Sequence, residues 1–396
     1  MDLATFAWLL TAAGQRLIAA AMASDLAENS QLQVLTQLRR AASAERAAAA
    51  YDLALVRQRA AAKFTHAADM YFTREACEQA SGEIIAQHRA TRYQGYGHVA
   101  DLACGIGGDA IGLARVTNVI AVDRDPLRLA MARENARVCG VGNRVRSVEA
   151  DLEHDDIPHA DALFFDPARR RGGRRVFSLD EYQPSLALIA RWHERTRAIG
   201  VKMAPGIHDD DVAALGAAEA EFVSVDGELK EAALWFGPLA TPGRRATLLT
   251  RAGDVLTMHA PTVQTNIGVA EPRAYLYEPD PAIIRAHLVA EVAAQIDATQ
   301  FDSSIAYLSA DQRITTPWAR CWRVVEWLPF NLKRLRVRLR ALDAGAVTVK
   351  KRGSPLDTDA LAKQLAADGT RPLVVVLTKL RAKPIVLICE GPMRDA

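Results

Sequence analysis

Two carboxylates and a glycine-rich turn between residues 98 and 126 have the types and spacing needed to hold a nucleoside. Asp101 lies in a short apolar run that is typical of a buried strand, and three glycines break that run: Gly105, Gly107 and Gly108. Helical spacing resumes after them, and a second apolar run ends at Asp123. Glycine lets the backbone pass close to a ligand, and an acid at the tip of the next strand can accept hydrogen bonds from ribose hydroxyls. This stretch predicts a site for a nucleoside-containing cofactor.

Two cofactors compete for that site. The spacing Gly105-x-Gly107-x-x-Ala110 nominally fits the dinucleotide fingerprint, which is a weak match by itself. Asp101 argues against a dinucleotide, which has no use for a carboxylate inside the first strand. S-adenosylmethionine does, because its methionine end carries an ammonium group that an anion can bind. DLACGIGGDA followed by AVDRDP resembles motif I and the ribose-binding acid of class I methyltransferases, so we expect S-adenosylmethionine rather than NAD or a βαβ unit without ligand.

Further cofactor contacts are expected close to these motifs. A strand over residues 145–148 ends near Asp151, and an acid after the third strand of this fold commonly accepts a hydrogen bond from the adenine amine. On residue type alone, Asp151 is equally an acid in a solvated loop. The residues expected at the cofactor are Asp101, Cys104, Gly105, Gly107, Asp123, Arg124, Asp151 and Leu152.

Another acid marks the place where the acceptor would bind. Asp166-Pro167 follows the apolar run 162–165, at a carboxyl end where open α/β sheets bind ligands. Amine methyltransferases carry here an acid, amide or serine, then two prolines and an aromatic residue. This chain keeps the acid and the first proline but has Ala168-Arg169 in place of the rest. The resemblance implies that the Asp166 carboxylate and the Pro167 carbonyl hold the acceptor amine.

A cluster of arginines follows that acid. Its members are Arg169, Arg170, Arg171, Arg174 and Arg175, interrupted by two glycines. Such a charge run is usually a solvated loop, but its place at the edge of the site favours phosphate binding. The planar guanidinium of Arg169 could stack on a base in place of the missing aromatic ring. Arg169, Arg170 and Arg171 are therefore predicted to contact the substrate.

Composition limits the class of protein. The chain has 396 residues, half of them hydrophobic, and a formal net charge of +2. This predicts two or three domains with a sizeable core and excludes a globally polycationic protein. Five scattered cysteines without a C-x-x-C motif favour free thiols in a reducing compartment over disulfides or zinc. No apolar stretch approaches the roughly 18 residues of a membrane span. We expect a cytoplasmic protein that binds neither metal nor membrane.

Three regions are predicted. Residues 1–90 are rich in alanine and lack proline, which favours helices; Tyr71-Phe72 would serve as a packing lid or lie at the mouth of the site. Residues 91–252 alternate apolar runs with helical patterns, which predicts the α/β sheet. The charged residues within 228–231 either line its pocket or, as we favour, sit on a turn. Residues 253–396 predict a small α+β module.

The C-terminal module concentrates positive charge. Residues 330–342, FNLKRLRVRLRAL, predict an amphipathic helix with leucines facing inward and arginines covering the rest. A second basic element, residues 350–352, is expected in a loop. Solvated arginines with buried stems would explain the helix alone. Two basic elements in one module favour an RNA-binding surface, with Arg336 and Arg340 as contacts.

A family resemblance covers most of the chain beyond the first 60 residues. Residues from about 63 to 250 resemble the bacterial class I methyltransferases related to RNA cap guanine-N2 methyltransferase (trimethylguanosine synthase), through EQASGEIIAQHRA, DLACGIGGDA, AVDRDP and FFDPARR. Residues from about 255 to 392 look like the ferredoxin-like and THUMP-like modules of that group, through LYEPDPAIIRAHL and VKKRGSPLD. The resemblance implies an α/β fold with a Rossmann-like, seven-stranded class I methyltransferase sheet, an N-terminal helical region and a C-terminal α+β module.

The sequence leaves three functions open. The favoured one is transfer of a methyl group from S-adenosylmethionine to a base nitrogen, guanine N2 or a similar exocyclic amine, of a structured RNA such as tRNA or rRNA. The second is methylation of a small molecule or a protein. The third is an RNA-binding protein that keeps the cofactor fold without catalysis, which the intact glycines and acids disfavour.

Overall fold

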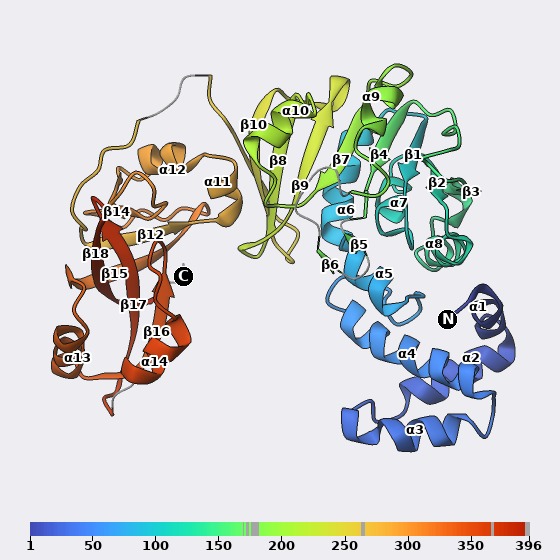
Figure 1. The fold of residues 1–396 in the computed structure, drawn as a ribbon, viewed down its shortest axis with the longest axis horizontal. Coiled ribbons are helices and arrows are strands. Elements are labelled where there is room, and N and C mark those ends of the chain that lie inside the picture. The colour runs from blue at the N-terminus through green and yellow to red at the C-terminus, as the bar shows by residue number, and fades with distance from the viewer. Residues whose placement is uncertain (169, 172–173, 176–181, 263–265, 366–367, 393–396) are drawn as a thin grey trace. The chain divides into compact units, whose positions relative to one another are not determined.

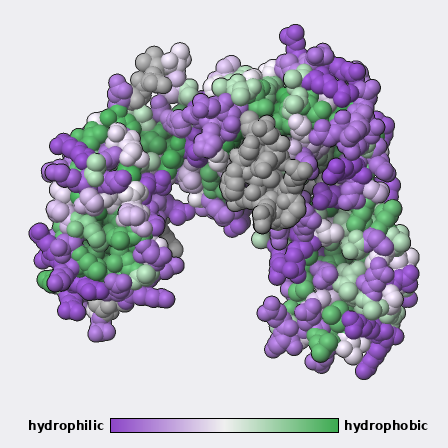
Figure 2. Space-filling view, in the orientation of Figure 1, coloured by the Kyte–Doolittle hydropathy of each residue, from purple (hydrophilic) through white to green (hydrophobic). Residues whose placement is uncertain are grey.

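The structure is a computed structural model of the chain. It describes residues 1–392 apart from 169, 172–173, 176–181, 263–265 and 366–367. The chain forms two compact units. Unit 1 comprises Met1–Val223, Glu231–Gly243 and Leu249–Asp254, and unit 2 comprises Ser224–Lys230, Arg244–Leu248 and Val255–Ala396. Hydrophilic residues cover most of the face shown in Figure 2.

The first 90 residues are helical, as their composition predicts. The helices are α1 (Leu3–Leu9), α2 (Ala12–Met22), α3 (Gln31–Leu38), α4 (Ala44–Ala60), α5 (Arg74–Gln79) and α6 (Glu83–Ala90). Side-chain oxygens cap several of their N-termini, including the predicted cap Thr73, which accepts a hydrogen bond from the backbone N–H of Ala76. Helix α1 lies beside α8 (Pro126–Val138) (Figure 1). Tyr71 and Phe72 are buried in the core that these helices share with α8. Their burial in this core favours the packing role, and neither residue lines the cavity described below.

The larger sheet of the structure has nine strands. Its strand order is β11-β10-β8-β9-β7-β4-β1-β2-β3. The strands are β1 (His98–Leu102), β2 (Asn118–Asp123), β3 (Val145–Glu149), β4 (Ala162–Phe165), β7 (Ile199–Met203), β8 (Glu219–Val225), β9 (Glu228–Phe236), β10 (Gly243–Leu249) and β11 (Val255–His259). The connecting helices include α7 (Gly108–Leu113), α9 (Leu188–His193) and α10 (Asp209–Ala214). β1 lies between β2 and β4, parallel to both.

The sheet contains the expected seven strands in Rossmann-like order and two more. β8 and β9 continue it beyond β7, and β9 runs antiparallel to β7. β10 and β11 then extend it past β8, which corrects the expected count from seven to nine. The register aligns Leu102 with Val122 and with Phe165. The carboxyl ends of the three central strands therefore lie together, where Asp123 and Asp166 follow.

Unit 2 contains a seven-stranded sheet of order β13-β14-β12-β15-β18-β17-β16. Its elements are β12 (Tyr275–Pro279), α11 (Pro281–Arg285), α12 (Val289–Gln295), β13 (Thr299–Gln300), β14 (Leu308–Ala310), β15 (Ala319–Pro329), α13 (Leu332–Ala341), β16 (Ala344–Lys351), α14 (Thr358–Leu365), β17 (Arg371–Leu380) and β18 (Lys383–Pro392). Leu335 and Leu339 of α13 are buried, as the amphipathic pattern predicts. Lys350 and Lys351 lie in β16 and not in the predicted loop, because that strand pairs with β17 as far as Lys351.

Among the described residues, no single helix is both long and apolar enough to cross a membrane. The helices α1 and α2 together would be, by length and composition only, but the chain bends by 84° between them.

The contact between α6 and α7 requires a glycine. A Cβ added to Gly112 would lie 2.7 Å from the carbonyl oxygen of Ala86 on α6. That distance is too short for a carbon–oxygen contact, and the obstacle is backbone, so one helix would have to move. The close spacing of these two helices thus depends on the absence of a Cβ at Gly112.

We expect Gly112→Ala to lower the free energy of unfolding by about 1–3 kcal/mol, the usual cost of overpacking. Gly206→Ala is the control, because a Cβ at Gly206 would meet nothing within 4 Å. Urea unfolding measures both variants. Equal stability of the two would show that α6 and α7 are not in tight contact.

Candidate active site

A cavity of about 370 Å³ lies at the carboxyl ends of the central strands of unit 1. Its walls are formed by the glycine turn, the tips of β2 and β4, the loop after β3, Lys202 of β7 and the segment from α5 to α6. The residues around it are Glu75, Ala76, Glu78, Gln79, Ala80, Ser81, Ala103, Cys104, Gly105, Ile106, Gly108, Asp109, Asp123, Arg124, Asp125, Arg128, Ala150, Leu152, Asp166, Pro167, Ala168, Gln183, Pro184 and Lys202.

Asp123 holds the glycine turn in place. Its Oδ2 accepts a hydrogen bond of 2.9 Å from the backbone N–H of Gly105, and its Oδ1 accepts one of 3.0 Å from Asp125. Gly105 has a φ of +56° and Gly107 a φ of +85°, a region that favours glycine. An ionised carboxylate offers about four acceptor positions, so Asp123 can hold the turn and still accept from two further donors.

Asp166 forms an ion pair at the end of β4. Its Oδ2 lies 2.6 Å from the Nζ of Lys202, whose side chain is only 5 % exposed. The Nζ of Lys202 also lies 3.4 Å from the carbonyl oxygen of Gln79, in the wall that precedes α6. This ammonium therefore joins two walls of the cavity.

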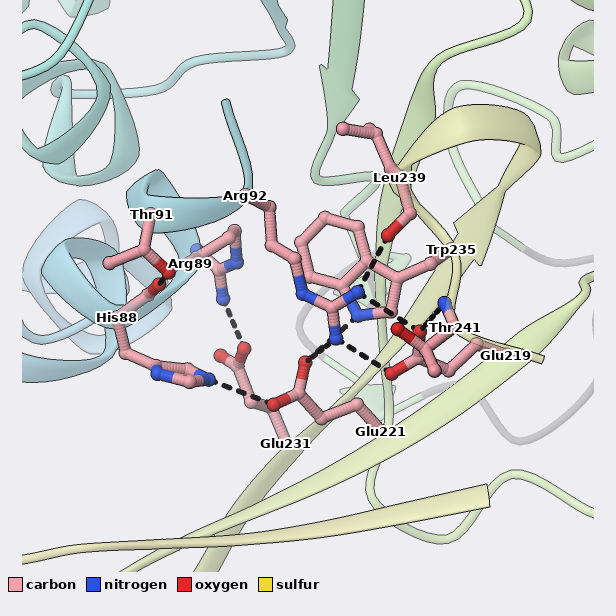
Figure 3. A network of polar contacts seen from close by, with 10 residues as sticks. All are labelled: His88, Arg89, Thr91, Arg92, Glu219, Glu221, Glu231, Trp235, Leu239 and Thr241. Carbon is pink, nitrogen blue, oxygen red and sulfur yellow. Dashed lines mark hydrogen bonds and ion pairs between the residues drawn. The ribbon is translucent and has the colours of Figure 1, made fainter. Parts of the chain in front are cut away.

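A buried network of charges fixes α6 and the 3-10 turn that follows it (Thr91–Tyr93) against the strands β8 and β9 (Figure 3). The guanidinium of Arg92 donates to both carboxylate oxygens of Glu219, at 2.6 and 2.9 Å. His88 Nε2 lies 2.8 Å from Glu221, which also accepts from the indole N–H of Trp235. Arg89 pairs with Glu231. Because α6 directly follows the wall residues, this network sets the position of that wall.

Glu231 corrects the interpretation of residues 228–231 as a turn. The turn lies directly before β9, at Asp226 and Gly227, which both have positive φ. Glu231 sits inside β9 and is buried, because Arg89 from α6 neutralises it.

Comparison with known proteins places this geometry in a family. A family model described as RNA cap guanine-N2 methyltransferase matches residues 96–187, one described as THUMP domain-like matches residues 319–391, and a domain of unknown function matches residues 2–60. Two curated relatives, both named uncharacterized S-adenosylmethionine-dependent methyltransferases, come from two strains of Mycobacterium tuberculosis. Each is 39% identical to this chain over 358 residues, which cover 87% of this chain and 96% of the relative. The chain belongs to the S-adenosylmethionine-dependent methyltransferases.

A solved structure shares the fold of this methyltransferase over nearly its whole length. A crystal structure assigned to the methyltransferases, from Porphyromonas gingivalis W83, aligns with a TM-score of 0.73 and 20% sequence identity, covering 98% of this chain and 99% of that one. At this identity the likeness establishes the fold alone.

Asp101 fits a cationic part of the cofactor. The side chain is fully buried, and neither carboxylate oxygen has a hydrogen-bond partner among the described residues. Buried polar atoms are normally paired. S-adenosylmethionine carries an ammonium group, which is the type of donor that this acid lacks. The unpaired acid below the glycine turn is thus the feature that best matches the cofactor of this family.

The cavity brings together most of the expected cofactor and catalytic residues. Those that line it are Cys104, Gly105, Asp123, Arg124, Leu152, Asp166 and Pro167. Asp101 and Gly107 are not among the lining residues; Asp101 is fully buried, and a Cβ at Gly107 would meet Ala132 of α8 at 3.1 Å. Asp151 does not line it: its Oδ1 accepts from the N–H of Glu153, and its neighbours Ala150 and Leu152 line the wall instead.

The predicted substrate residues lie in three places. Arg169 is outside the described residues. Arg170 and Arg171 form β5 (Arg170–Arg171), which pairs antiparallel with β6 (Arg174–Arg175) in a hairpin that follows Asp166. Arg336 and Arg340 belong to α13 of unit 2.

Sequence reasoning missed Lys202 and the wall before α6. One feature of the sequence could have indicated Lys202: it is the only charged residue in the apolar run Ile199–Met203. The wall residues, among them Gln79 and Ser81, lie in the segment EQASGEIIAQHRA that carried the family resemblance. Among the described side chains there is no group of three or more His, Cys, Asp or Glu that could hold a metal ion.

The titration of Asp101 gives a pH-dependent prediction. Burial and the nearby Asp166 raise the pKa of Asp101 to about 8, whereas an aspartate in an unfolded chain has a pKa of about 4. Between these values the folded protein keeps a proton that the unfolded chain has lost, so its stability falls as the pH rises. We expect Asp101→Asn to remove this loss. Its stability relative to the unmodified protein should rise by up to about 1.4 kcal/mol per pH unit from about pH 4 to 8.

Urea unfolding without cofactor, repeated across that pH range, tests this expectation. Asp156→Asn is the control, because Asp156 is an exposed acid of unit 1. Parallel stability curves for Asp101→Asn and the unmodified protein would contradict the shifted titration of Asp101.

Proposed function

We propose that this methyltransferase methylates an exocyclic amine of a base, guanine N2 being the first candidate, in a structured RNA such as tRNA or rRNA. One observation carries the proposal: Asp166-Pro167 and the glycine turn held by Asp123 line the same cavity. An acceptor amine at Asp166 would therefore lie in the cavity that takes the cofactor. The family models add support for RNA, through the guanine-N2 methyltransferase match over residues 96–187 and the THUMP domain-like match over residues 319–391.

The protein's part in the reaction is positioning. When bound, S-adenosylmethionine supplies a methyl group on a sulfonium, a strong electrophile that needs little further activation. Asp101 would pair with its ammonium group, and Asp123 would accept from its ribose hydroxyls. Asp166 would accept a hydrogen bond from the acceptor amine, with the Pro167 carbonyl as second acceptor. Holding both reactants in one cavity replaces a bimolecular encounter with an oriented one.

We expect Asp166→Ala to reduce methyl transfer to RNA by at least about 10²-fold, the scale of losing one positioned catalytic group, while S-adenosylmethionine still binds. Tritium transfer to RNA from a strain that lacks this gene measures activity, and calorimetry measures cofactor binding. Asp156→Ala is the matched control. Full activity of Asp166→Ala would place the reacting amine elsewhere, and transfer only to protein or small molecules would replace RNA as the substrate.

The basic helix α13 is the proposed RNA contact of unit 2. Arg338 is engaged by Glu326, with an N–O distance of 2.8 Å. Arg336 donates to Gln364, an uncharged partner, and Arg340 is exposed. Arg336 and Arg340 therefore keep the charge that phosphates would meet, whereas Arg338 is neutralised within the unit.

Replacing Arg336 and Arg340 by alanine should weaken binding about equally across RNA sequences, because phosphates carry no sequence information. Each lost contact should reduce the slope of log affinity against log salt by about 0.7 to 0.9. Filter binding at several salt concentrations measures the slope, with Arg338→Ala as the control on the same helix. An unchanged slope in the double variant would remove α13 from the RNA-binding surface.

A further inference from the structure

A lysine takes part in the cavity beside the proposed catalytic acid. Lys202 lies on β7, and its residue is 4% exposed. A buried ammonium is costly unless it is paired, and here two acceptors engage it: Oδ2 of Asp166 at 2.6 Å and the carbonyl oxygen of Gln79 at 3.4 Å. Because the ammonium has three N–H groups, it can donate to both acceptors at once. The two contacts together fix its position.

We infer that Lys202 is a positioning residue for methyl transfer: it orients the Asp166 carboxylate toward an uncharged amine and joins that acid to the wall before α6. The inference rests on the proposed function and assigns Lys202 a role that acts through Asp166. With Oδ2 taken by Lys202, the other carboxylate oxygen is left for the acceptor. A carboxylate without this partner could rotate, and a misplacement of about 1 Å can cost about 10²-fold in rate.

The same ion pair favours one class of acceptor. Lys202 offsets the charge of Asp166, because its Nζ lies 2.6 Å from the carboxylate. A lysine side chain arrives as an ammonium, since its pKa is about 10.4, and would meet the cation of Lys202. An exocyclic amine of a base is neutral and meets no such repulsion. The pair thus favours nucleobase amines over protein lysines.

The transfer balances without another reactant. A bond forms between the amine nitrogen and the methyl carbon while the carbon–sulfur bond breaks, and its electron pair goes to sulfur. The methylated nitrogen then carries an extra proton, which passes to Asp166 and from there to water.

A double-substitution cycle tests whether Lys202 acts through Asp166. We expect Lys202→Met to lower kcat on RNA by about 10²-fold with little change in KM, while Lys202→Arg, which keeps a cation, retains most of the activity. Adding Lys202→Met to Asp166→Asn should cause no further loss of kcat. Independent, multiplying losses would overturn the inference, because Lys202 would then act on something other than Asp166.

Thermal unfolding of the same variants separates this inference from the proposed function. Lys202→Met leaves the Asp166 carboxylate without its partner, so we expect its Tm to lie below that of the double variant. Coupled Tm values are those in which the effects of the two substitutions do not add. If the Tm values are coupled but methyl transfer occurs to a lysine-rich peptide and not to RNA, the ion pair between Lys202 and Asp166 stands. RNA as the substrate and the preference for neutral amines would then be overturned. Uncoupled Tm values would overturn the positioning role whatever the substrate.

Discussion

The buried guanidinium of Arg89 connects the parts of unit 1 that enclose the cavity. It pairs with Asp109, in the first turn of α7 after the glycine turn, and with Glu231 in β9. Its Cζ also lies 4.4 Å from the centre of the Phe164 ring in β4. Loss of this cation would leave two buried carboxylates uncompensated, and breaking a buried pair in this way costs about 3–5 kcal/mol. The geometry of the cavity thus depends on a residue that lies outside it.

The N-terminal helices take part in the same construction. The ammonium of Lys63, just after α4, donates to the carbonyl oxygens of Cys77, Glu78 and Ala80. Cations are favoured at the C-terminal end of a helix, which is where these carbonyls of α5 lie. On the other side, the amide of Asn135 donates to the carbonyl oxygens of Tyr71 and Ile106. The helical region therefore helps to fix both the wall before α6 and the glycine turn.

Sequence reasoning succeeded where neighbouring residues decide the structure. The strand, glycine turn and acid between residues 98 and 126 form as predicted, because positive φ at Gly105 and Gly107 and the apolar runs on either side are local properties. It failed where a partner lies far along the chain. Glu231 resembles a turn residue until Arg89, which lies 142 positions away, neutralises it inside β9. Lys202 needs Asp166, 36 positions away, before it becomes more than an irregularity in an apolar strand. The two added strands also depend on pairing that composition does not encode.

Asp101 shows how a site for a charged cofactor conflicts with folding stability. An unpaired carboxyl at the centre of a sheet destabilises the protein without ligand, because its polar atoms have lost water and gained no partner. An apolar residue of similar size at position 101 would avoid this destabilisation, but it could not bind an ammonium group. The cost is offset on binding, since a ligand that binds only the folded state stabilises it in proportion to the logarithm of its concentration over Kd. An acid that is poorly satisfied in the protein alone is therefore expected where the cofactor brings the missing donor.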